Sequence, residues 1–227
     1  MLTLKESISR IKSLMKLHEV INIDNAGFSI DILSQHKSFS SRIKFCDSLT
    51  KLGVGSSRRV YKLGNTALKL AINDKGIHQN KAEASSDIHQ YYDSIITNIV
   101  SVDPTFKWLV CELARKAKKD DFLKLTGIPY DIFIEFMSYR IMVLGQNGGK
   151  YQIDHGLNDE QLDYCNENSF MGDLLELIGS YGIAGGDLTR ISSYGVVNRN
   201  GKDVLVLLDY GGTETILQNM YMREELD

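Results

Sequence analysis

The sequence predicts an α+β protein of two lobes, a small N-terminal lobe with an antiparallel sheet and a larger, mainly helical C-terminal lobe. Three observations predict it: strand patterns gather before residue 114, helix patterns follow, and a hairpin returns near the end of the chain. We expect lobes over 51–114 and 115–227, joined near residues 112–118, with 1–50 as a helix-and-strand extension.

The first half of the chain holds most of the predicted strands. Strand patterns occur over 28–32, 59–63, 66–71, 99–102 and 108–113. Gly64 and Asn65 supply the turn residues of a hairpin between the second and third of these strands. The segment 76–96 lacks alternation and predicts one helix, and apolar residues at helical spacing predict an amphipathic helix over 1–17.

The second half is mostly helical in pattern. Helices are expected over 121–125, 130–144, 159–166, 171–181 and 214–225. Asn200 and Gly201 form the turn of a second hairpin, with strands over 194–199 and 202–208.

Composition excludes several classes of protein. The longest apolar stretches fall short of the roughly 20 residues that span a bilayer, and the N-terminus lacks the features of a secretory signal. The sequence therefore predicts an intracellular, cytoplasmic protein that does not enter membranes. A formal net charge of −3 argues against nucleic-acid coating, with the basic run 115–119 interpreted as a solvated turn. The three separated cysteines predict neither a disulfide framework nor a zinc site.

A glycine pair precedes the first hairpin. Gly53, Gly55 and Val60 fit the spacing G-x-G-x-x-G-x-V, in which missing side chains allow backbone N–H groups to approach phosphates. Arg58 stands at the third glycine position, where it would either reach a phosphate or obstruct one. An ordinary turn that needs positive φ is the alternative explanation of the two glycines.

The next strand carries a candidate phosphate-binding lysine. The run Thr66 to Lys69 resembles the V-A-I-K strand, whose lysine contacts the α- and β-phosphates and is held by a helix glutamate. Glu83 is the expected partner. An edge-strand lysine and a solvated glutamate remain the alternatives. Glu112, at the expected joint of the lobes, completes the predicted nucleotide-binding set.

Two acidic motifs follow in the second half. Asp187 begins a loop after a helix, and Asp209-Tyr210-Gly211 ends the second hairpin. With the glycine loop, strand lysine and helix glutamate before them, these motifs resemble the protein-kinase superfamily, including its antibiotic- and choline-kinase-like branches. The resemblance, over about 52–211, implies binding of ATP and Mg²⁺, with Asp187 facing the acceptor hydroxyl and Asp209 holding the metal.

The chain departs from the family pattern at several positions. Ser192 stands where the family has a metal-binding asparagine, and Gly185-Gly186 replaces the His-Arg before the catalytic aspartate. No A-P-E signature follows Asp209, which argues against an ordinary regulated protein kinase. We expect an ATP-dependent phosphotransferase acting on an unknown small-molecule or protein acceptor.

Two alternatives come from other functional classes. A pseudokinase would bind a nucleotide or a partner without phosphoryl transfer, as Ser192 and Arg58 suggest. A structural scaffold would instead dock an assembly partner through the N-terminal amphipathic stripe of Leu4, Ile8, Ile11 and Met15.

Overall fold

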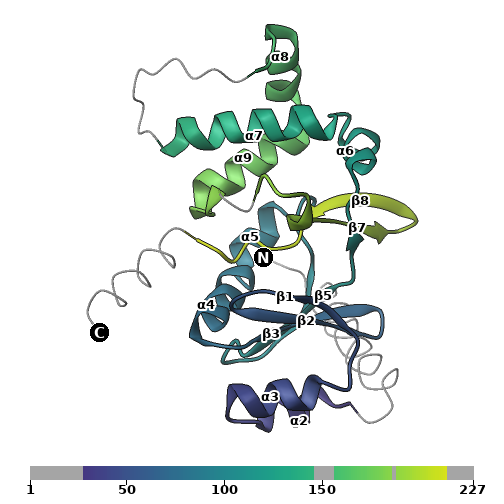
Figure 1. Ribbon diagram of the computed structural model, residues 1–227, viewed down its shortest axis with the longest axis vertical. Helices are drawn as coiled ribbons and strands as arrows, with labels where there is room; N and C mark the ends of the chain where they lie inside the picture. The colour runs from purple at the N-terminus through teal and green to yellow at the C-terminus, as the bar shows by residue number, and fades with distance from the viewer. Residues whose placement is uncertain (1–27, 146–155, 186–187, 214–227) are drawn as a thin grey trace, which may run out of the picture. The chain divides into compact units, whose positions relative to one another are not determined.

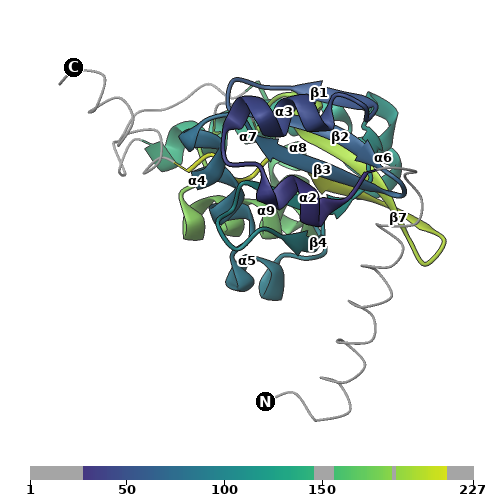
Figure 2. The same ribbon diagram turned by 90° about the horizontal axis from the view of Figure 1, so that it is seen from below.

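The computed structural model describes residues 28–145, 156–185 and 188–213. The fold is α+β, with two antiparallel sheets and several helices (Figures 1 and 2). The chain divides into two compact units, the first formed by Met1–Ala84 and Asn98–Leu113, the second by Ser85–Thr97 and Ala114–Asp227.

The first unit is built on a five-stranded antiparallel sheet in the order β1-β2-β3-β5-β4. Its strands are β1 (Lys51–Val54), β2 (Arg58–Leu63), β3 (Thr66–Ala71), β4 (Ile99–Val102) and β5 (Trp108–Glu112). Its helices are α2 (Ile30–Gln35), α3 (Phe39–Cys46) and α4 (Asp74–Glu83).

The two faces of this sheet meet different helices. Side chains on one face of the sheet, including Tyr61, Leu68 and Leu70, are buried in an apolar cluster with residues of α2 and α3. In Figure 1 these two helices lie beneath the sheet. Lys69 projects from the opposite face and contacts Glu83 of α4. Helix α4 therefore covers that face.

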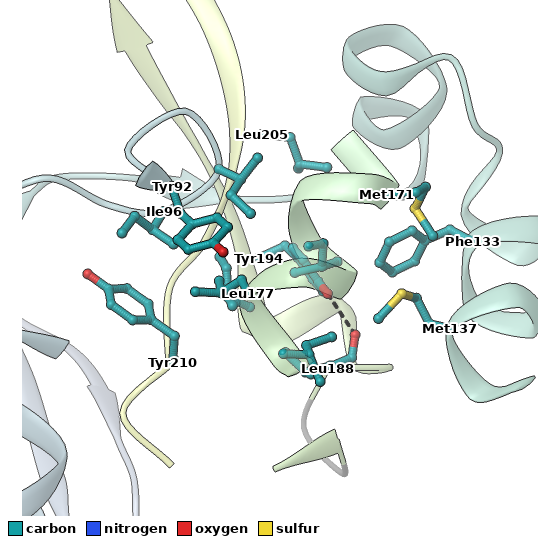
Figure 3. Packing of buried hydrophobic residues seen from close by; sticks show 14 of the residues in the cluster. Tyr92, Ile96, Phe133, Met137, Met171, Leu177, Leu188, Tyr194, Leu205 and Tyr210 are labelled. Atoms are coloured by element: carbon teal, nitrogen blue, oxygen red, sulfur yellow. Dashed lines mark hydrogen bonds between the residues drawn. The ribbon is translucent and has the colours of Figure 1, made fainter. Parts of the chain in front are cut away.

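The second unit combines a three-stranded sheet with helices. The sheet has the order β6-β7-β8, with β6 (Arg115–Lys116), β7 (Tyr194–Arg199) and β8 (Lys202–Leu207). Its helices are α5 (Ser86–Tyr91), α6 (Lys119–Thr126), α7 (Tyr130–Gly145), α8 (Asp159–Glu167), α9 (Ser169–Tyr181) and a 3-10 turn at Ile191–Ser193. Aromatic and aliphatic side chains from the helices and the hairpin fill its core (Figure 3).

Residues 85–97 belong to the second unit because they bond to its hairpin. The backbone N–H of Leu207 donates to the carbonyl of Ile95 at 2.7 Å. The guanidinium of Arg199 donates to the carbonyls of Asp93 at 2.6 Å and Ile96 at 2.7 Å. This segment lies within the range that the sequence assigned to the N-terminal lobe.

Both predicted hairpins are confirmed, with strand bounds within one residue of the expected ones. The strand predicted over 28–32 is wrong, because Ile30–Gln35 is helical. The Ser29 hydroxyl caps this helix by accepting from the N–H of Ile32. Three alternating apolar residues were too few to distinguish a strand from a short helix.

The single helix predicted over 76–96 is also wrong. Helix α4 ends at Glu83 and α5 begins at Ser86, so the chain breaks where it leaves the first unit. Ser85 and Ser86 lie at this break, and serine favours helix ends over helix interiors. The helices predicted over 1–17 and 214–225 lie outside the described residues.

The basic run 115–119 is not the solvated turn that the sequence predicted, because Arg115–Lys116 forms strand β6 and helix α6 begins at Lys119. Arg115 contacts Asp121 at 2.7 Å and Asp203 at 3.6 Å, and Lys119 contacts Asp131 at 2.8 Å.

In the described part of the chain, every helix is too short or too polar to cross a membrane.

Candidate nucleotide-binding site

Predicted site residues of three strands lie directly beside one another in the first unit. Gly53 of β1 pairs with Val60 of β2, and Val60 pairs with Lys69 of β3. Lys69 in turn pairs with Leu109 of β5. Because directly opposed residues of neighbouring strands project from the same face of a sheet, Val60, Lys69 and Leu109 share one surface, and Gly53 leaves its edge without a side chain.

The two glycines are not required by the backbone conformation. Neither Gly53 nor Gly55 adopts positive φ, unlike Gly64 in the following hairpin turn. A Cβ atom at Gly53 would meet no described atom within 4 Å, and one at Gly55 would meet only the Arg58 carbonyl at 3.7 Å. The Gly55 N–H donates to that carbonyl at 2.8 Å and closes the turn. The glycines therefore leave open space along this edge of the sheet.

Lys69 forms the expected ion pair with the helix glutamate. Its Nζ lies 2.6 Å from Oε2 of Glu83, which is the last residue of α4. The guanidinium of Arg58 contacts the other carboxylate oxygen, Oε1, at 2.7 Å. All three side chains are buried, and Glu83 has no exposed surface. One carboxylate is thus held by two cations from neighbouring strands.

The cations keep Glu83 ionised despite its burial. Burial alone would raise the pKa of a carboxyl group, because an apolar interior disfavours the charged form. The charges and hydrogen bonds of Arg58 and Lys69 outweigh burial and lower the pKa of Glu83 from 4.5 to about 2. The ammonium of Lys69 is therefore held in place by an anion at neutral pH.

Helix α4 is fixed against the turn that joins β1 to β2. Asn73 caps the helix by accepting from the N–H of Gly76, and its amide donates to the carbonyl of Ser56 at 3.0 Å. The Ser57 hydroxyl donates to the side chain of Gln79. These contacts tie the glycine loop to the helix that carries Glu83.

Asn80 connects Arg58 to a further part of the first unit. Its carbonyl oxygen accepts from the Arg58 guanidinium at 3.3 Å, and its amide nitrogen donates to the Phe106 carbonyl at 2.9 Å. Asn80 is fully buried, and these two hydrogen bonds satisfy both polar ends of its amide. Arg58 is thereby fixed at both Glu83 and Asn80.

An apolar surface lies on the same sheet face as Lys69. Ala67, Leu109 and Cys111 form a separate buried cluster, against which Val60, Ile99 and Leu113 pack. Ala67 lies two residues before Lys69 on β3, and Leu109 pairs with Lys69. Val60, Ile99 and Leu113 are partly exposed, so a flat apolar group could pack on them while an attached anion reached the ammonium.

Glu112 has a structural partner within the first unit. Its carboxylate accepts from the backbone N–H of Asn98 at 2.9 Å and from the Asn98 amide at 3.3 Å. These bonds fix the start of β4 beside the end of β5. Its predicted contact with a nucleotide stays a prediction.

In the second unit, the predicted metal ligands Ser192 and Asp209 lie near each other. The backbone N–H of Leu208 donates to the carbonyl of Ser193 at 2.8 Å, and each predicted ligand is adjacent to one of these residues. Both ligand residues are exposed. Two residues that carry hard oxygen donors therefore lie at the same end of the hairpin.

Tyr210, the residue after Asp209, is anchored by its side chain. Its ring is buried, and its hydroxyl donates to the carbonyl of Thr97 at 3.1 Å and lies 3.4 Å from Nε2 of His89. A phenylalanine at this position would supply the ring but not the hydrogen bonds. The tyrosine of the D-Y-G triplet thus fixes the end of the hairpin to the segment 85–97.

Asp187 lies outside the described residues. The next residue, Leu188, is fully buried, and its carbonyl accepts from the hydroxyl of Tyr194 at 2.8 Å (Figure 3). Burial raises the pKa of Tyr194, which therefore stays a protonated donor.

Among the residues that the structure describes, no group of three or more His, Cys, Asp or Glu side chains is arranged to hold a metal ion. In comparisons with known proteins, no family model matches the chain and no curated protein matches it in sequence.

The sequence did not reveal how Arg58 is used. The glycine motif suggested only a direct effect of Arg58 on a phosphate, whereas in the structure its guanidinium contacts Glu83. A signal was present in the strand period: Arg58 is two residues from Val60, and Val60 pairs with Lys69, so Arg58 and Lys69 share a face. Asn80 and Gln79 gave no such signal, because contacts from a helix to a loop follow no fixed spacing.

Proposed function

We propose that the protein is an ATP-dependent phosphotransferase with a protein-kinase-like fold. The observation that carries the proposal is the buried ion pair of Lys69 and Glu83, formed on the sheet face that Gly53 leaves open. A lysine fixed by a helix glutamate beside a glycine-bearing strand edge is the arrangement that kinases use to position triphosphates.

The chemistry of the sheet face supports a nucleotide as the ligand. Lys69 offers an ammonium to an anion, and the partly exposed Val60, Ile99 and Leu113 beside it offer an apolar surface. A nucleoside triphosphate combines a planar, largely apolar base with a polyanion. In the proposal the base packs on these partly exposed side chains and the phosphates lie toward Lys69, with Gly53 and Gly55 leaving room for them.

Asp209 and Ser192 fit the role of magnesium ligands. Mg²⁺ binds through oxygen atoms, usually one or two carboxylates together with waters and substrate phosphates. Asp209 supplies one carboxylate and Ser192 a neutral hydroxyl at the same end of the hairpin. The ion would neutralise charge on the transferring phosphoryl group.

Asp187 is assigned the acceptor side of the reaction. Its carboxylate orients the acceptor hydroxyl and takes its proton as the oxygen attacks the γ-phosphorus. The bond from that phosphorus to the β,γ-bridging oxygen breaks, and ADP leaves with the bridging oxygen. Lys69 holds the phosphates in position throughout.

A transfer assay with radiolabelled γ-phosphate tests the proposal, using water and a panel of hydroxyl-bearing small molecules and proteins as acceptors. The wild-type protein should turn ATP over in the presence of Mg²⁺. Asp187→Ala should abolish turnover, by roughly 100-fold or more, while ATP binding persists. Turnover that is unchanged in Asp187→Ala contradicts the mechanism.

A thermal-shift titration, combined with the transfer assay, separates the pseudokinase alternative, which the neutral, exposed Ser192 favours. Mg·ATP should raise the melting temperature of either an enzyme or a nucleotide sensor, because a ligand that binds the folded state stabilises it. A protein that is stabilised by Mg·ATP but transfers no phosphate to any acceptor or to water is the sensor. A protein that Mg·ATP does not stabilise at any concentration is neither.

A further inference from the structure

Arg58 occupies the third position of the glycine motif but contributes to the interior of the first unit. Its side chain is 6% exposed, and its guanidinium contacts Glu83 at 2.7 Å and Asn80 at 3.3 Å. A residue at this position in a phosphate-binding loop would ordinarily be small. Here it is a buried cation, directed at the same carboxylate that holds Lys69.

This second cation changes the charge balance beside Lys69. A lysine paired with one glutamate forms a neutral pair, and Arg58 adds one positive charge to it. The three side chains are buried, so water screens this charge less than it would at the surface. An anion that approaches Lys69 therefore meets a stronger positive potential with Arg58 present than without it.

The position of this charge is fixed by the same contacts that hold the loop. Asn80 accepts from Arg58 and donates to the Phe106 carbonyl, so the guanidinium has a firmly placed neighbour on the helix side. Glu83 can remain ionised through Arg58 while Lys69 turns part of its hydrogen bonding to a ligand. Arg58 thereby acts on the ligand through Glu83 and Lys69 rather than by contact.

We propose that Arg58 is a positioning residue that makes the Lys69 site selective for polyphosphates over uncharged nucleosides. The inference rests on the proposed function, since it concerns the same nucleotide site. It extends that function by naming the feature of the ligand, its negative charge, that Arg58 recognises in place of the third glycine.

The test compares the affinities of ATP and adenosine, measured by calorimetric titration in wild-type protein and in Arg58→Gln. Loss of one buried charge should weaken ATP binding by about tenfold or more, while adenosine binding changes by less than about twofold. A purely structural role would weaken both ligands to the same extent. The ratio of the two affinities therefore reports charge rather than folding.

Arg59→Gln is the matched control. Arg59 is the next residue on β2, projects from the other face, and lies 3.9 Å from Asp47. Its replacement changes the total charge of the protein equally but removes no charge from the Lys69 site. The ratio of ATP to adenosine affinity should stay within about twofold of the wild-type ratio.

Arg58→Lys is a second control, because it changes the side chain at this position but keeps its charge. Its ratio should also stay close to that of the wild type. A ratio that falls about tenfold in Arg58→Lys, or one that is unchanged in folded Arg58→Gln, overturns the role of Arg58 alone. A wild-type protein that binds no ATP instead contradicts the proposed function, and the inference falls with it.

Discussion

Glu83 is the residue on which the proposed site depends most. It is the last residue of α4, where the negative end of the helix dipole opposes a carboxylate. It is also fully buried, which opposes its ionisation further. The contacts with Arg58 and Lys69, at 2.7 Å and 2.6 Å, supply the positive charge that keeps this carboxylate ionised.

Glu83→Gln should destabilise the protein strongly. The substitution leaves two buried cations without their carboxylate, a loss of roughly 3–5 kcal/mol in the free energy of unfolding. Urea denaturation at pH 7 measures this loss. Glu167→Gln is the control, because Glu167 is likewise the last residue of its helix, α8, but is exposed. A loss in Glu83→Gln no larger than that in Glu167→Gln would show that the ion pairs contribute nothing.

The same carboxyl group predicts a dependence of stability on pH. Its pKa is lowered from 4.5 to about 2 on folding, so the folded state holds fewer protons there than the unfolded state between these values. Its stabilising contribution is complete above pH 4.5 and is lost as the pH falls toward 2. Between pH 5 and pH 3, stability should fall less steeply in Glu83→Gln than in Glu167→Gln. Parallel profiles would contradict the assignment.

At the residue scale, the sequence predicted part of the site. The pairing of Lys69 with Glu83 followed from motif order and is present in the structure. The link from Arg58 to Glu83 was missed, because the glycine motif directed attention to the phosphate rather than to the alternation of β2.

At the scale of elements, helix α4 and the loop before β2 form one packed assembly. Gly76, in the first turn of α4, lies against the loop so closely that an added Cβ would be 2.2 Å from the carbonyl oxygen of Ser57. The same Cβ would lie 3.0 Å from Cα of Ala71. Both neighbours are backbone atoms, so a side chain here requires the helix to move away from the loop.

Gly76→Ala should therefore destabilise the protein by about 1–3 kcal/mol, although alanine is the better helix former. Gly179→Ala is the matched control, because Gly179 lies in helix α9 and a Cβ there would meet nothing within 4 Å. That change should be neutral or stabilising, by up to about 1 kcal/mol. Thermal unfolding of the two variants measures the difference, and stabilisation by both would contradict the close approach of α4.

Elements with strong local signals were predicted well and others were not. The hairpin of β2 and β3 has a Gly64-Asn65 turn and clear alternation, and its bounds were found within one residue. Helix α2 failed because its six residues are too few to display a helical period. The boundary between α4 and α5 failed because the two helices belong to different units, a tertiary property that local pattern does not contain.

At the scale of the whole molecule, the α+β class and the antiparallel sheets were predicted from the order of the elements. The discontinuous composition of the units was not. Residues 85–97 join the second unit through Arg199, Leu207 and Tyr210, which follow more than 100 residues later in the chain. Contacts at such separations leave no periodic trace in the segments that make them.

A crystal structure of the full chain with a non-hydrolysable ATP analogue and Mg²⁺ tests the central claim most directly. We expect the triphosphate beside Nζ of Lys69, with the base on the partly exposed Val60, Ile99 and Leu113. A nucleotide bound elsewhere, with Lys69 and Glu83 remote from its phosphates, would contradict the account.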